Sequence, residues 1–95
     1  MSKVFVGEVG KRFEVDTEYP IPSGATVSLI VKKPSGTKIE WAGSIESNTY
    51  IVYETNIGDL NEAGTWQLQA KIQWNDGVKD NVLYGEITSF EVGEL

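Results

Sequence analysis

Apolar and polar residues alternate with a period of two along most of this chain, which is typical of strands that have one buried and one wet face. The clearest run is 66–74, where every even position is apolar and every odd position is Gln or Lys. Residues 27–32 alternate in the same way except at Ile30, and the segment 33–36 after them contains Pro34 and Gly36, which favour a tight turn. No segment of ten or more residues repeats every three to four positions, as a helix would. The pattern therefore predicts an all-β protein.

Further strands are expected before and after these two runs. Ile39, Trp41 and Ile45 share one parity, so their strand should pair back on 27–32 as a hairpin. Gly7 and Gly10 separate two short N-terminal apolar segments, and glycines of this kind let a first strand switch sheets at a bend. The remaining expected strands are 4–6, 13–15, 49–54 and 84–92, the last with Phe90 and Val92 facing inward after an Asp76-Gly77 hairpin turn.

The length of 95 residues suits one β-sandwich and is too short for two cores, so we expect a single domain over residues 1–95. About seven short strands with turns between them predict an antiparallel sandwich of the immunoglobulin or fibronectin type. An open barrel of the oligonucleotide-binding type is the alternative. The expected core residues share the inward parity of their strands: Leu29, Trp41, Trp66, Leu68 and Ile72.

Charge and composition narrow the function. The net charge of −6 argues against nucleic acid and against anionic membranes, since both require a basic face. The chain contains no apolar run as long as a membrane helix, and its start does not resemble a signal peptide, so we expect a soluble protein that stays in the cytoplasm. Because cysteine is absent, stability must come from packing.

The missing residue types also restrict the chemistry. Without His or Cys, the chain has no Ser-His-Asp triad, no cysteine nucleophile and no ordinary zinc site. The 14 acidic residues are scattered, and no phosphate-binding glycine motif occurs. Asp76 and Asp80, with Asn75 and Asn81, suggest calcium, but no Glu closes the loop as in a calcium site. We therefore expect no enzymatic activity, no catalytic residue, no cofactor and no metal.

One local motif favours the sandwich. Immunoglobulin-like domains carry an acidic-Leu pair, a Gly and an aromatic residue at the corner before the penultimate strand, and the matching residues here are Asp59-Leu60, Gly64 and Trp66. Leu68 stands where many antibody domains place a cysteine. Trp66 replaces the usual Tyr, so either its indole N–H substitutes for the tyrosine hydroxyl or the side chain is simply part of the core. We favour the core, because a buried aromatic contributes mainly through the area it removes from water.

The segment 31–37, the strand around Trp41 and the segment 58–70 together resemble small immunoglobulin-like domains of tailed bacteriophages and prophages. In that group a Lys-Pro-x-Gly hairpin and a Leu-x-x-x-Gly-x-aromatic corner recur in virion proteins. The resemblance covers residues from about 27 to 92 and implies a structural role in a virion, as a capsid decoration, a head fibre or a tail- or baseplate-associated module. It also implies assembly in the host cytoplasm and partners that are other virion proteins, with a homo-oligomer as a further possibility.

A contact with such a partner should use apolar side chains on a face that is otherwise wet. The candidates are Ile30, which is out of phase in its strand, and Tyr50 with Val52, which have the parity opposite to Ile51 and Tyr53. Either parity of 50–53 can be the inward one.

The second hypothesis is a carbohydrate-binding module. Three Trp and four Tyr residues are enough for a platform on which sugar rings stack. Parity assigns Trp41, Trp66 and Trp74 to the core, which leaves few aromatic residues for this purpose. Trp74 lies next to the turn at 75–77 and is the one expected to be half exposed.

Overall fold

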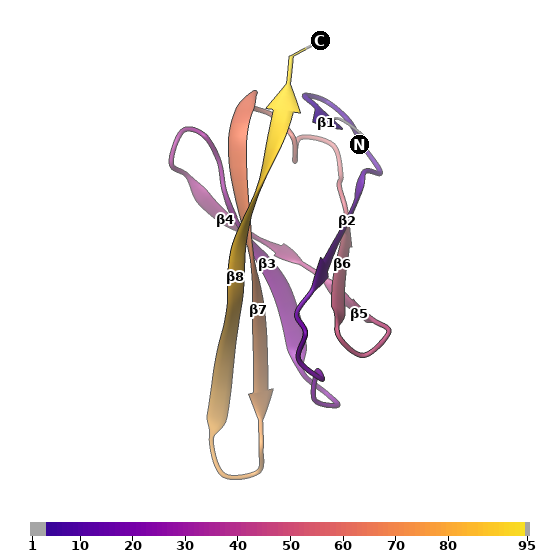
Figure 1. Ribbon diagram of the computed structural model, residues 1–95, viewed down its shortest axis with the longest axis vertical. Coiled ribbons are helices and arrows are strands. Elements are labelled where there is room, and N and C mark those ends of the chain that lie inside the picture. Colours follow the sequence, from indigo (N-terminus) through magenta and orange to yellow (C-terminus); the bar gives the residue numbers. More distant parts are fainter. Residues whose placement is uncertain (1–3, 95) are drawn as a thin grey trace.

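The computed structural model describes residues 4–94, which form eight strands in two sheets (Figure 1). One sheet has five strands in the order β1-β8-β7-β3-β4, and the other has three in the order β2-β6-β5. Residues 4–94 contain no helix and therefore no membrane-spanning helix. The expected domain span of 1–95 includes residues 1–3 and 95, which lie outside the described residues. The strands are β1 (Val4–Phe5), β2 (Arg12–Asp16), β3 (Thr26–Lys32), β4 (Lys38–Ala42), β5 (Ser44–Glu46), β6 (Tyr50–Glu54), β7 (Gly64–Asn75) and β8 (Asp80–Gly93).

The all-β prediction is confirmed, and the two sheets pack as in a β-sandwich around a shared core. The sheets are not purely antiparallel, because β1 runs parallel to β8, with Val4 opposite Val92. The predicted change of sheet at Gly7 and Gly10 does occur. The chain leaves β1 in the five-stranded sheet and enters the other sheet at β2.

The expected strand 39–45 is divided into β4 and β5, which belong to different sheets. β4 pairs with β3 as the hairpin prediction required, whereas β5 pairs with β6. The division falls at Gly43, where a Cβ atom would lie 2.6 Å from Cγ2 of the buried Ile51. A glycine is needed because the backbone crosses so close to the core. Ile45 keeps the parity of Trp41 but is exposed on the short edge strand β5.

The core lies between the sheets and has an aromatic centre. The five predicted core residues are all buried, each with at most 5% of its surface exposed. Trp41 stacks on Tyr53 with ring centroids 4.7 Å apart, and Phe13 lies 4.8 Å from Phe90. Because Phe13 and Tyr53 come from one sheet and Trp41 and Phe90 from the other, these ring contacts hold the two sheets together.

The corner before β7 supports both interpretations of Trp66. Its side chain is fully buried, and its indole Nε1 donates a hydrogen bond of 3.0 Å to the carbonyl oxygen of Glu62. The indole therefore makes a backbone bond while it fills the core.

The 33–36 hairpin packs directly on this corner. A Cβ atom on Gly64, whose φ is +129°, would lie 2.8 Å from Cγ of Pro34. The Lys33 ammonium lies 5.7 Å from the centre of the Trp66 ring, and the Ser35 hydroxyl donates to Glu62 at 3.1 Å. The two motifs that carry the resemblance are thus in contact with each other.

β8 contains a bulge that changes which face its side chains occupy. Gln69 of β7 lies opposite Ile87 while Lys71 lies opposite Tyr84, so two residues of β8, Gly85 and Glu86, span the position of Ala70. Such a bulge reverses the parity of the strand beyond it. The Gln69 side-chain amide donates a hydrogen bond of 3.0 Å to the Gly85 carbonyl and so caps the bulge.

Candidate binding surface

The exposed apolar residues of the five-stranded sheet gather on β8. Val82 is 47% exposed, Tyr84 is 54% exposed and Ile87 is 59% exposed. All three lie opposite outward-facing residues of β7, namely Gln73, Lys71 and Gln69 in the same order. The strand therefore presents an apolar row on the outside of the sheet, where alternation alone would place polar residues.

Ile30 continues this row across the sheet. It lies opposite Gln69 of β7, which in turn lies opposite Ile87 of β8. Between Ile30 and Ile87 the surface has a shallow depression of about 150 Å³, lined in addition by Lys32, Lys38 and Gln67. We call this surface the β8 face and define it by Ile30, Gln69, Lys71, Val82, Tyr84 and Ile87.

Lys71 of the β8 face is paired with the polar residues next to it. Glu40 accepts a hydrogen bond of 2.9 Å from the Ser28 hydroxyl and one of 3.3 Å from the Lys71 ammonium. The Ser28 hydrogen bond, followed by that from Lys71, lowers the pKa of Glu40. The carboxylate thus stays ionised and holds Lys71 on the β4 side, which leaves the β8 side of the face apolar.

The structure separates the three residues predicted to contact a partner. Ile30 is half-buried on the β8 face, whereas Tyr50 and Val52 lie on β6 in the other sheet. Within 50–53 the inward residues are Ile51 and Tyr53, so Tyr50 and Val52 do face outward. Tyr50 is exposed, but Val52 is only 7% exposed, so its expected accessibility was wrong.

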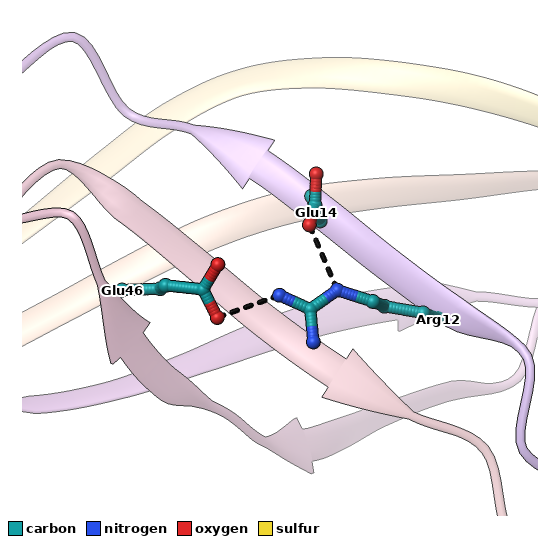
Figure 2. Close-up of polar contacts among 3 residues, drawn as sticks. All are labelled: Arg12, Glu14 and Glu46. Carbon is teal, nitrogen blue, oxygen red and sulfur yellow. Dashed lines mark hydrogen bonds and ion pairs between the residues drawn. The ribbon is translucent and has the colours of Figure 1, made fainter.

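An ion-pair bridge crosses the outer face of the three-stranded sheet, where Val52 lies. The Arg12 guanidinium reaches from β2 across β6 and donates to Glu14 at 2.8 Å and to Glu46 of β5 at 2.6 Å (Figure 2). Val52 lies on the same outer face, opposite Glu14. The hydrogen bonds from Arg12 to Glu14 and Glu46 raise the pKa of the guanidinium. Arg12 therefore spans the three-stranded sheet on the face that also carries Val52.

Sequence reasoning missed the apolar row of β8, and for Val82 and Tyr84 the bulge is the reason, whereas Ile87 has the outward parity even in a regular strand. Val82 and Tyr84 share even parity with the inward Phe90 and Val92, so a regular strand would bury all four. Gly85 was the available signal, since a glycine inside a strand pattern often marks a bulge. Its position fits, because a Cβ atom on Gly85 would lie 3.3 Å from Cβ of Ala70.

The turn that suggested calcium uses its carboxylates to hold its own backbone. Asp76 accepts hydrogen bonds from the N–H groups of Val78 at 2.9 Å and Lys79 at 3.0 Å, and from the Asn81 amide at 3.2 Å. The bonds from Lys79 and Val78 are the main cause of the lowered pKa of Asp76. Across residues 4–94, no group of three potential metal-ligating side chains comes together.

The aromatic residues that suggested sugar binding do not form a platform of several rings. Trp41 and Trp66 are buried between the sheets. Trp74 is half-buried, as expected for its position at the strand end, and its ring is tilted against that of Tyr19 with centroids 6.2 Å apart.

No protein-family model, no curated protein and no solved structure matches this chain.

Proposed function

We propose that this chain is a non-enzymatic binding module with an immunoglobulin-like fold that serves as a structural part of a phage virion, as a capsid decoration or a head- or tail-associated protein. The observation that carries the proposal is the apolar row of Val82, Tyr84 and Ile87 on the outside of β8, with each side chain about half exposed. Desolvated aromatic and aliphatic anchors supply much of the energy of protein contacts, so this row is suited to a protein partner.

Two features support the immunoglobulin-like and phage parts of the proposal. The 33–36 hairpin and the corner at Trp66 are the motifs of the resemblance, and Pro34 packs against Gly64 at their junction. The shape of the molecule is also suitable, because β7 and β8 extend as a long hairpin beyond the other strands and leave the β8 face accessible (Figure 1). A repeated site on a symmetric particle would let many modest contacts of this size coat the surface.

A co-sedimentation experiment tests the proposal. Purified chain is mixed with phage particles released from the cells that encode it, and the bound fraction is measured after the particles are pelleted. We expect wild type to pellet with the particles and the double variant Tyr84→Glu, Ile87→Lys to remain in the supernatant. The matched control is Tyr50→Glu on the opposite sheet, which should pellet like wild type. Each of these surface changes should alter the free energy of unfolding by only about 0.5 kcal/mol, so all variants should stay folded.

The outcomes separate the proposal from its alternatives. If the Tyr84 and Ile87 variant pellets like wild type while Tyr50→Glu does not, the contact lies on the three-stranded sheet and the β8 face is the wrong surface. If wild type binds no particle but is retained on a polysaccharide column, the virion role fails and the carbohydrate-binding alternative replaces it.

A further inference from the structure

β8 has a long edge without a neighbouring strand. Within residues 4–94, β1 pairs with β8 only at Val92 and Gly93, and β7 covers the other edge from Asp80 to Val92. In the part of the chain that the structure describes, residues 80–91 therefore have a strand on one side and none on the other (Figure 1). An unpaired strand edge exposes a row of backbone N–H and C=O groups that can pair with another chain.

The pairing of β1 shows which residues direct these groups outward. The Gly93 carbonyl accepts a hydrogen bond of 2.9 Å from the N–H of Val6, so Gly93 directs its polar groups to the β1 side. Since backbone direction alternates along a strand, Glu91, Ser89 and Ile87 direct theirs to the same side, beyond the end of β1. The residue that exposes its side chain on the β8 face, Ile87, thus also offers its backbone at the free edge.

This edge lacks most of the features that prevent strand addition. Proteins protect edges by keeping them short or by placing Lys or Pro on them. β8 has 14 residues with neither Lys nor Pro, and one bulge at Gly85 and Glu86. The edge strand at the other side of this sheet, β4, has 5 residues and contains Lys38, and the edge strand β5 has 3 residues.

Charge indicates the kind of strand that fits. The charged side chains of β8 are Asp80, Glu86 and Glu91, all acidic, on a chain of net charge −6. A second copy paired edge to edge would bring these acids close to their equivalents, and like charges on neighbouring strands are destabilising. A strand with basic side chains would instead be attracted to all three.

We propose that the free edge of β8 binds an extended segment of another protein, with apolar residues in its middle and basic residues toward its ends, and adds it to the five-stranded sheet as a further strand. The inference rests on the proposed binding function and names the chemistry of the partner. Backbone hydrogen bonds would hold the segment, and its apolar side chains would lie beside Tyr84 and Ile87. The basic side chains toward its ends would meet Asp80 and Glu91, which face the same side of the sheet as Tyr84 and Ile87.

A synthetic peptide tests this directly. The probe is a fluorescent peptide of about twelve residues, with Val and Thr in the middle and two Lys residues at each end, enough to span 80–91 in an extended strand. Fluorescence anisotropy at low salt should show binding to wild type, and replacing the Lys residues of the peptide by Glu should weaken it at least about tenfold. Ser89→Pro removes one N–H from the free edge, where proline is tolerated, and should also weaken binding about tenfold. The matched control Ser89→Ala keeps the N–H and should bind like wild type.

Hydrogen exchange makes the test independent of how Ser89→Pro folds. In wild type, the amides of Ile87, Ser89 and Glu91 should exchange quickly without the peptide and become protected when it is bound. If the peptide binds and these amides stay unprotected, or if Ser89→Pro folds and binds it as tightly as Ser89→Ala does, strand addition is wrong. The proposal would also be overturned if wild type bound no peptide but formed a concentration-dependent dimer that Ser89→Pro abolishes. A second copy of the chain would then occupy the edge.

The two proposals fail in different ways. Wild type that takes up the peptide but pellets with no particle contradicts the virion role and leaves the edge inference intact. If Ser89→Pro pellets like wild type and the peptide does not bind, the virion role stands and the edge inference fails.

Discussion

Tyr53 shows how a single side chain links the core to the corner. Its ring stacks on Trp41, while its hydroxyl donates a hydrogen bond of 2.6 Å to Asp59. The same Asp59 oxygen accepts the backbone N–H of Asn56 at 2.6 Å, so one carboxylate fixes both the tyrosine and the loop. Burial, and then the hydrogen bond to Asp59, raises the pKa of Tyr53 from 10.0 to about 12.

Tyr53→Phe should lower the free energy of unfolding by about 1.5 kcal/mol near neutral pH, because it removes a hydrogen bond to a charged acceptor and keeps the ring. The pKa of Tyr53 is higher in the folded state than its ordinary value of 10.0, so its contribution is complete below pH 10 and is lost as the pH rises through about 12. Urea denaturation at several pH values should show the difference between wild type and variant shrinking over this range. Tyr50→Phe is the control, and a difference that stays constant up to pH 12 would contradict the assignment.

At the scale of the strand, alternation located most elements but not their interruptions. The run 66–74 became β7 with its predicted inward residues, because a regular strand with one buried face leaves a direct trace in the sequence. The break at Gly43 left no such trace, since Trp41 and Ile45 keep the same parity across it. The bulge at Gly85 had the opposite effect and reversed the parity, so the outward direction of Val82 and Tyr84 was hidden. Gly43 packs closely against Ile51, and Gly85 packs closely against Ala70. These contacts decide where the strand breaks or bulges, and the periodicity of the sequence carries no information about them.

Gly43→Ala should destabilise the protein by about 1–3 kcal/mol, because the new Cβ would lie 2.6 Å from Cγ2 of Ile51 in a packed core. Ile51→Leu moves the branch of the side chain away from Cβ and removes that methyl group at nearly constant volume. A double-mutant cycle measured by thermal denaturation should therefore show that Gly43→Ala costs less when Ile51→Leu is present. Additive effects of the two changes would show that Gly43 is required for a reason other than this contact.

For the whole molecule, the important feature is that the two sheets share one core. Trp41 of the five-stranded sheet contacts Phe13 and Tyr53 of the three-stranded sheet, with ring centroids 5.6 Å and 4.7 Å apart. The chain passes from one sheet to the other near Gly7 and Gly10, and again at Gly43. Neither sheet can then lose its packing without exposing the inward face of its partner, so residues 4–94 should unfold as a unit.

Leu68→Ala tests this cooperativity from the centre of the core. Leu68 lies on β7 opposite Val31 and Thr88, is 5% exposed, and its truncation should lower the free energy of unfolding by about 2–5 kcal/mol through lost burial and the cavity left behind. Tryptophan fluorescence reports mainly on the packing around Trp41 and Trp66, whereas far-UV circular dichroism reports on all strands. The two signals should give the same midpoint in wild type and again, at lower urea concentration, in the variant, with the slope of the transition unchanged. Two separate midpoints in the variant would mean that one sheet survives without the other, and the shared aromatic centre would then not be what couples them.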